Sequence, residues 1–259
     1  LLVTVISYVV VDEKDPAFQN PTKPIGPAFN EDQVKGQPYP SIEVPGGFRR
    51  VVASPKPITI VEKREIKRLL DEDFVVICCG GGGIPVIREG RAFHGVDAVI
   101  DKDLASAILA KEINADIFVI ASDIAGAAIN WGTPEQQFLR QVSIGQMEQY
   151  IKQGQFPAGS MGPKVEAITE FFKATGNRGV ICHLEDIEKA MVSVDWDQFP
   201  TRIADGVFDK EPIRNRQPRR AGLWPFLLQP RFRFAYAGLL LRIIVGAVVA
   251  FLIFQSPPM

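Results

Sequence analysis

The sequence predicts an α/β domain with a largely parallel sheet, and three observations support this class. Apolar strand-like runs alternate with helix-like segments from residue 58 to residue 183, an order typical of parallel strands joined by crossover helices. Apolar residues make up 46% of the 259 residues, enough for a packed core. A glycine run, 80–83, follows one apolar strand directly, as it does where a sheet binds a ligand at its edge.

The first expected element is a buried strand at residues 3–11, whose β-branched residues suit a strand better than a signal peptide. Residues 12–57 are rich in Pro, Gly, Asn and Asp, lack periodicity and are too long for an ordinary connection. We expect a functional flap or small subdomain there, with extended segments rather than helix.

A regular pattern begins at residue 58. We expect helices at 62–71, 103–113, 143–152 and 164–174, and strands at 74–79, 117–121 and 179–183. The loop 154–163 precedes the last helix. These elements complete an α/β domain that ends near residue 205.

Charge divides the chain into an acidic body and a basic tail. Residues 1–205 carry 21 Lys and Arg against 28 Asp and Glu, whereas residues 206–259 carry 8 against 2. Within the tail, residues 234–254 are apolar except for Arg242 and reach the roughly 20 residues of a membrane span. Contact with a membrane through this segment is one reading, and a buried hairpin or a misassigned reading frame are the others.

Cysteine and histidine usage predicts neither disulfides nor a metal centre. Cys78, Cys79 and Cys182 lie in apolar strand-like runs, where neighbouring residues point to opposite faces. We expect reduced thiols and therefore a cytoplasmic location. His94 and His183 lack metal-ligand spacing and are read as structural or surface residues.

The glycine run at 80–83 is the first candidate binding feature. Glycines after a strand let backbone amides approach an anion closely. The run matches neither a P-loop nor a dinucleotide fingerprint, because no GxxxxGK[ST] occurs and Pro85 stands at the third position of GxGxxG. A tight strand-to-loop turn without function is the alternative.

Lys102 and Lys164 are the candidate catalytic cations. Lys102 lies in IDKDLA at residues 100–105, where a loop becomes a helix. The alternative to a catalytic role is that Asp103 caps this helix beside a solvated lysine. Lys164 follows the glycine-containing loop FPAGSMGP, at a helix N-terminus whose amides favour an anion. Two lysines that converge on one group would stabilise a transferring phosphoryl group.

Ser122 and Asp123 follow the strand at 117–121. They are therefore expected at the carboxyl edge of the sheet, where open α/β sheets bind ligands.

Five segments together resemble carbamate kinases of the amino acid kinase family. They are NPTKPIGP at 20–27, RRVVASPKP at 49–57, CGGGGIPV at 79–86, VIDKDLAS at 99–106 and FPAGSMGPKVEA at 156–167. Their order and spacing also match, and the resemblance extends from about residue 3 to residue 205.

The resemblance implies a three-layer αβα sandwich with a small protruding subdomain at 12–57, and a homodimer. It implies reversible phosphoryl transfer between ATP and carbamate, with carbamoyl phosphate and MgADP as the other pair, used in arginine fermentation. Mg²⁺ would accompany the nucleotide, and no nucleic-acid partner is expected.

The resemblance also assigns roles to residues. Lys102 and Lys164 would stabilise the transferring group, and Asp103 would orient them. Lys23 in the flap and the glycines at 80–82 would bind the carbamoyl phosphate side. The nucleotide would be bordered by the following residues: Ser122, Asp123, Asn130, Gly132, Met161, Gly162 and Pro163. The substrate-binding glycines are Gly80, Gly81 and Gly82.

The sequence departs from the family pattern in three places. The family's first strand with its Gly-Gly-Asn loop and a second glycine-rich loop are not recognisable, so we expect an N-terminally incomplete domain. Ala125 stands where the family often has an acidic residue, and the basic tail is not a family feature. The competing hypothesis is therefore an inactive homologue that acts as a nucleotide-binding or membrane-tethered interaction protein.

Overall fold

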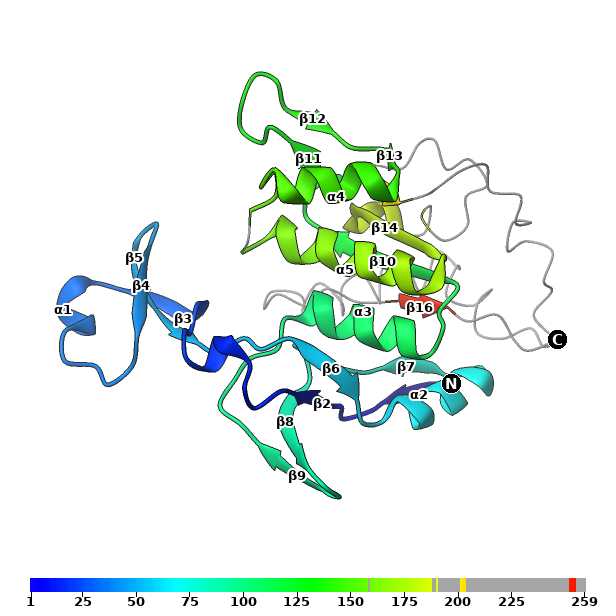
Figure 1. The fold of residues 1–259 in the computed structure, drawn as a ribbon, viewed down its shortest axis with the longest axis horizontal. Coiled ribbons are helices and arrows are strands. Elements are labelled where there is room, and N and C mark those ends of the chain that lie inside the picture. Colours follow the sequence, from blue (N-terminus) through cyan, green and yellow to red (C-terminus); the bar gives the residue numbers. More distant parts are fainter. Residues whose placement is uncertain (158, 188–189, 191–200, 204–251, 255–259) are drawn as a thin grey trace.

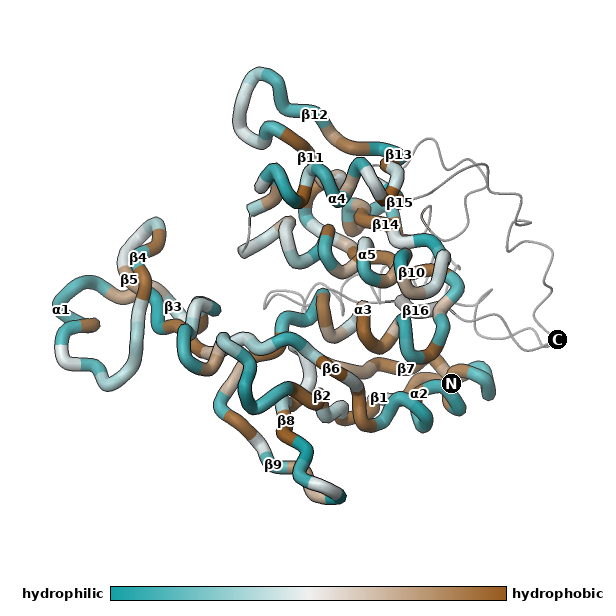
Figure 2. Tube along the Cα trace, viewed as in Figure 1, coloured by the Kyte–Doolittle hydropathy of each residue, from teal (hydrophilic) through white to brown (hydrophobic). Residues whose placement is uncertain are grey.

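A computed structural model describes residues 1–157, 159–187, 190, 201–203 and 252–254 (Figure 1). The body combines β-strands with a layer of three helices, and a small antiparallel sheet stands apart from it. Parallel and antiparallel ladders occur together in the body. The α/β class is confirmed, with parallel segments within mixed sheets. Figure 2 shows hydrophobic residues concentrated along the strands of the body, such as β1 and β2.

The single strand predicted at residues 3–11 is wrong, because two strands form there. β1 (Leu2–Thr4) pairs in parallel with β7 (Val75–Ile77), whereas β2 (Tyr8–Val11) lies between β6 (Pro57–Ile60) and β8 (Ile84–Glu89). The chain changes partners at Ser7. Its hydroxyl donates to the carbonyl of Val5 and accepts from the backbone N–H of Cys79, at 3.2 and 2.9 Å.

The strand that positions the candidate nucleotide residues is fully buried. β10 (Ile117–Ser122) pairs in parallel with β14 (Arg178–His183) over six residue pairs. The order of this sheet is β13 (Gln141–Val142), β15 (Thr201–Ile203), β14, β10 and β16 (Leu252–Phe254). Because β10 runs toward Ser122, its carboxyl end brings Ser122 and Asp123 to the edge where ligands bind.

Helices α3 (Lys102–Glu112), α4 (Ile144–Lys152) and α5 (Met161–Thr175) form the helical layer (Figure 1). Phe171 of α5 packs on Phe118 of β10 with ring centroids 5.4 Å apart. A Cβ at Gly179 of β14 would lie 2.8 Å from Cβ of Ile168, so glycine permits this close approach of helix and strand. α2 (Lys63–Asp71) buries Ile66.

Helix α5 begins three residues before the predicted start at residue 164. The loop residues Met161, Gly162 and Pro163 form its first turn instead. The N–H of Gly162 donates to the carbonyl of Pro157 at 2.9 Å, and a Cβ at Gly162 would meet that oxygen at the same distance. Proline is tolerated in a first turn because its missing N–H has no partner to lose there.

The flap, residues 12–57, contains the antiparallel sheet β3 (Lys23–Phe29), β5 (Gly47–Val52) and β4 (Ser41–Val44), in that order. It also contains a short 3-10 helix, η1 (Pro16–Phe18), and one short helix, α1 (Glu31–Val34), with a capping box at Asn30. Extended structure therefore dominates the flap as expected. Figure 1 shows this sheet projecting from the body beyond the N-terminal end of α3.

Two hairpins complete the described fold. β8 continues into β9 (Ala92–Gly95), and β11 (Ala128–Ile129) pairs with β12 (Gln137–Phe138). The second hairpin follows the loop that leaves β10. It therefore places Asn130 beyond the carboxyl end of the buried strand.

Cys78 and Cys79 do not point to opposite faces of a strand. β7 ends at Ile77, so both cysteines lie beyond the strand, and Cys79 has a φ of 59°. All three cysteines are free thiols, and burial raises the pKa of Cys182 to about 12.

The predicted basic tail at 206–259 and its apolar span at 234–254 lie outside the described residues except for 252–254. Those three residues form β16, which pairs antiparallel with β10. Within the described residues, no helix combines the length and the hydropathy needed to cross a membrane.

Candidate functional site

The N-terminal end of α3 is capped by Asp101 and not by Asp103, as the sequence had suggested. Asp101 has extended backbone angles, and its Oδ1 accepts from the N–H of Asp103 at 2.9 Å. Asp103 instead lies inside the first turn and is buried, with 4% of its surface exposed. The change frees the Asp103 carboxylate for another partner.

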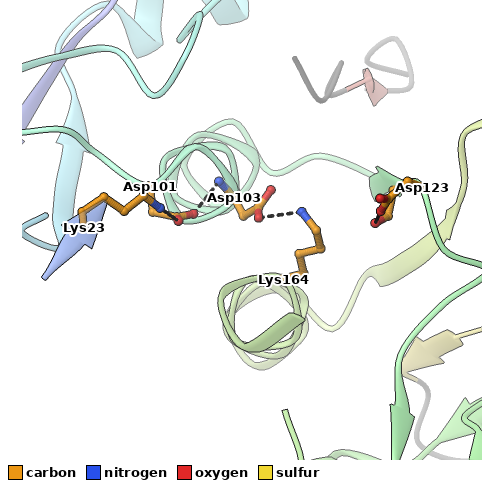
Figure 3. Close-up of polar contacts among 6 residues, drawn as sticks. Lys23, Asp101, Asp103, Asp123 and Lys164 are labelled. Atoms are coloured by element: carbon orange, nitrogen blue, oxygen red, sulfur yellow. Dashed lines mark hydrogen bonds and ion pairs between the residues drawn. The ribbon is translucent and has the colours of Figure 1, made fainter. Parts of the chain in front are cut away.

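That partner is Lys164, one of the two lysines that Asp103 was expected to orient. Its Nζ lies 2.9 Å from Oδ2 of Asp103, and both side chains are largely buried. The pair joins the first turn of α3 to the first turns of α5 (Figure 3). Burial raises the pKa of the Asp103 carboxyl, and the Lys164 ammonium opposes this rise without cancelling it.

Lys23 forms a second ion pair at the same helix end. Its Nζ lies 2.7 Å from Oδ2 of Asp101, the oxygen that does not cap the helix. Lys23 is the first residue of β3, so this pair joins the flap to α3. Burial by itself would raise the pKa of the Asp101 carboxyl. Lys23 and the amides of Asp103 and Leu104 outweigh this effect, so the pKa lies below its usual range.

Lys102 lies between the two aspartates in sequence and is half-buried. Among the described residues, no carboxylate lies within 4.0 Å of its ammonium. The N-terminal end of α3 thus has two paired lysines, one unpaired lysine and two aspartates, which gives the cluster a net charge of +1. A cluster with an excess positive charge at a helix N-terminus favours an anion.

The glycine turn lies directly against this cluster. Gly82 has a φ of 132°, and a Cβ there would lie 2.3 Å from the carbonyl oxygen of Ile100, the residue before Asp101. Gly80 and Gly81 face open space, since a Cβ on either would meet no atom within 4 Å. The structure thus brings the predicted substrate glycines next to the lysine cluster.

The candidate nucleotide residues form a second group. The hydroxyl of Ser122 donates to Oδ1 of Asp123 at 3.1 Å, and Figure 3 draws Asp123 apart from the two ion pairs. Asn130 has a φ of 52°, and its N–H donates to Oε1 of Gln155 at 2.9 Å. This bond ties the turn between β11 and β12 to the loop before α5. Gly132, also expected at the nucleotide, donates its N–H to Oε1 of Gln136 at 3.0 Å.

Neither histidine belongs to the site. Nδ1 of His183 accepts from the N–H of Glu185 at 3.3 Å, and His94 lies 3.3 Å from Glu89 on an exposed hairpin. No cluster of three or more His, Cys, Asp or Glu in the described part of the chain is arranged to hold a metal. One carboxylate oxygen at the site, Oδ1 of buried Asp103, lacks a hydrogen-bond partner in the described structure.

A groove of about 530 Å³ runs between α4 and α5. Gly162 and Pro163 line it, but Lys23, Lys102 and Lys164 do not. The lysine cluster is therefore separate from this groove.

Sequence reasoning missed two residues of the site. Asp101 was missed because the segment IDKD contains two aspartates, and the cap was assigned to Asp103 instead of Asp101. Gln155 had no local signal, since its partner Asn130 is 25 residues away. Contacts of this range depend on the fold.

The model of the amino acid kinase family matches residues 25–183, which is more than half of the chain. The chain belongs to the amino acid kinase family. Within this family, it is 48% identical over 195 residues to a carbamate kinase of Pyrococcus horikoshii, covering 73% of this chain and 62% of that one. It is 50% identical over 179 residues to a carbamate kinase-like protein of Escherichia coli, covering 68% and 58%.

Solved structures of the family agree with this assignment. Carbamate kinase from Giardia lamblia bound to AMP-PNP has a TM-score of 0.70 and 42% identity, covering 79% of this chain and 66% of that chain. A protein from Aeropyrum pernix has a TM-score of 0.70 and 41% identity. The chain spans about 62% of the length of the Pyrococcus relative.

Proposed function

We propose that this protein is a carbamate kinase, which reversibly transfers a phosphoryl group between ATP and carbamate. The observation that carries the proposal is the convergence of Lys23, Lys102 and Lys164 on the N-terminal end of α3, beside the glycine turn. The relatives of similar sequence that bear the name carbamate kinase support the choice of acceptor within the family.

The proposed mechanism relies on positioning and charge. Lys102 and Lys164 neutralise the negative charge on the oxygens of the transferring group, and Lys23 binds the carbamoyl phosphate side. Asp103 orients Lys164 through the 2.9 Å ion pair. No covalent enzyme intermediate is needed, because the nucleophile and the leaving group are both substrate oxygens.

Mg²⁺ is proposed to enter with ATP or ADP and to neutralise charge on the phosphates when bound. Such an ion needs only one or two protein carboxylates, because the phosphates and water supply its other ligands. Asp103, with one free oxygen, and Asp123, at the end of β10, are the described carboxylates that fit this role. Ser122, Asn130, Met161, Gly162 and Pro163 would border the nucleotide.

Carbamoyl phosphate and MgADP are proposed as the physiological substrates, so the enzyme would form ATP in arginine fermentation. A homodimer in the cytoplasm is part of the same proposal. The comparisons give no support to the alternative of an inactive, membrane-tethered homologue, and the lysine cluster argues against the loss of the catalytic groups.

The acceptor is tested by offering the purified protein MgATP with four acceptors in separate reactions. These are carbamate formed from ammonium and bicarbonate, N-acetylglutamate, aspartate and uridylate. ADP formation with carbamate alone is the expected result. Turnover with another acceptor, and none with carbamate, would assign the site to a different reaction of the family.

A further inference from the structure

Asp101 has no role in the mechanism above, although its carboxylate pairs with Lys23, one of the three lysines. We propose that Asp101 is a positioning residue that holds the flap lysine, Lys23, over the N-terminal end of α3, ready for the anionic substrate. The inference rests on the proposed function for the identity of that substrate, but the position of the flap can be tested separately.

Two oxygens of one carboxylate serve different elements. Oδ1 of Asp101 accepts from the N–H of Asp103 at 2.9 Å and so fixes the side chain to the helix. Oδ2 lies 2.7 Å from Nζ of Lys23. Because the carboxylate is planar and held at one end by the helix, the position of Lys23 is set by the first turn of α3, as Figure 3 shows.

The backbone brings the root of the flap to the same place. The carbonyl of Ala53 accepts from the N–H of Val99 at 2.9 Å, and Ala53 forms a bridge with Ala98. The segment at 98–101 thus contacts the outgoing strand of the flap through its backbone and the incoming strand through Asp101. Because the same segment contacts both strands at the base of the flap, the pair of Asp101 with Lys23 constrains the direction in which the flap projects.

Only two of the described ion pairs join the flap to the helical layer, and they differ in burial. In the Lys23–Asp101 pair the side chains are 33% and 13% exposed, whereas in the Lys56–Glu166 pair they are 73% and 41% exposed. Exposed pairs are weak because water screens them and the long side chains lose entropy. We therefore assign the positioning to Asp101 and use Glu166 as the matched control.

Lys23 pairs with Asp101, whereas Lys164 pairs with Oδ2 of Asp103. Each flanking lysine thus has its own carboxylate, with Lys102 between them in the first turn. Lys102 has no carboxylate within 4.0 Å in the described structure, so the pair of Lys23 with Asp101 leaves the charge of Lys102 uncompensated. Because the flap lysine is already paired at the end of α3, less ordering of the flap is needed when an anion binds.

The test compares Asp101→Asn with Glu166→Gln. Asparagine caps helices about as well as aspartate, so the substitution removes the charge and keeps the cap. Spin labels on genetically encoded residues at exposed positions 37 in the flap and 153 after α4 report the flap position. We expect a single narrow distance distribution in the parent protein and in Glu166→Gln, and a broad one in Asp101→Asn.

Kinetics supply the second readout. Asp101→Asn is expected to raise the KM for carbamoyl phosphate at least tenfold and to leave the KM for MgADP within twofold. Lys23→Met should raise the same KM, and the double variant should be no worse than Lys23→Met alone. This pattern distinguishes positioning from a general loss of structure, which would affect both substrates.

The proposal is overturned if Asp101→Asn keeps the narrow distance distribution, or if Glu166→Gln broadens it to the same extent. Equal effects of Asp101→Asn on both KM values would also overturn it. If the parent protein transfers no phosphoryl group to carbamate, the proposed function fails, while the distance measurement still decides whether Asp101 positions the flap.

Discussion

The ammonium of Lys164 lies 2.9 Å from Oδ2 of Asp103, while Oδ1 of the same buried carboxylate has no hydrogen-bond partner in the described structure. A buried carboxylate with one unsatisfied oxygen is costly, and such groups are found where function requires them. Lys164, in addition to its proposed role in phosphoryl transfer, is therefore the group that makes an ionised Asp103 tolerable.

Lys164→Met is expected to destabilise the fold by roughly 3 kcal/mol, because it leaves a buried carboxylate without its partner. Lys164→Met combined with Asp103→Leu should recover most of this loss, since no buried charge remains. Urea unfolding at pH 7 measures both. If Lys164→Met is as stable as the parent protein, the pair of Lys164 with Asp103 does not stabilise the fold.

Lys102→Ala should separate activity from stability. Lys102 has no carboxylate within 4.0 Å in the described structure, so its removal should change the free energy of unfolding by only about 0.5 kcal/mol. Turnover should fall about 10²- to 10³-fold, the usual effect of removing one group that stabilises transition-state charge. Activity assays and urea unfolding on the same preparations check this contrast. A loss of stability large enough to explain the loss of turnover would contradict it.

The lowered pKa of Asp101 implies that the stability of the fold depends on pH. Its pKa is lower in the folded protein than in the unfolded chain, so its contribution is present above the unfolded pKa of about 3.9 and is lost as pH falls through the folded value. The difference in free energy of unfolding between the parent and Asp101→Asn should be full above about pH 5 and shrink toward zero in more acidic solution. A difference that grows on acidification would contradict the assigned direction.

Gly82→Ala and Gly81→Ala form a matched pair. Gly82 has a φ of 132°, which other residues rarely adopt, and its Cβ would lie 2.3 Å from the carbonyl oxygen of Ile100. We expect a loss of at least about 2 kcal/mol in the free energy of unfolding from strain and displacement of the α3 N-terminus. Gly81→Ala meets no atom within 4 Å, and a change under about 1 kcal/mol is expected. Thermal unfolding of both variants measures the difference, and equal stabilities would contradict the expected strain at Gly82.

Local pattern was sufficient for the regular helices of this chain. Apolar periodicity located α2, α3 and α4 to within one residue at each end. It placed the start of α5 too late, because Gly162 and Pro163 look like loop residues. Their conformation depends on the carbonyl of Pro157, which receives the N–H of Gly162.

Long-range contacts set the limit of prediction for the site. Motif resemblance proposed Lys23, Lys102, Asp103 and Lys164 as site residues. It did not predict the pairing of Lys23 with Asp101, because these residues are 78 positions apart. The break in the predicted strand at residues 3–11 has the same origin. β1 and β2 are separate because their partners, β7 on one side and β6 with β8 on the other, belong to different sheets.

The most direct test of the central claim is ATP formation from carbamoyl phosphate and MgADP by the parent protein, Lys102→Ala, Lys164→Met and Lys23→Met. If the three lysines converge on the transferred phosphoryl group, the parent forms ATP and each variant is at least about a hundredfold slower at saturating MgADP. A parent protein that forms no ATP, or three variants that stay within a few-fold of the parent rate, would contradict the account.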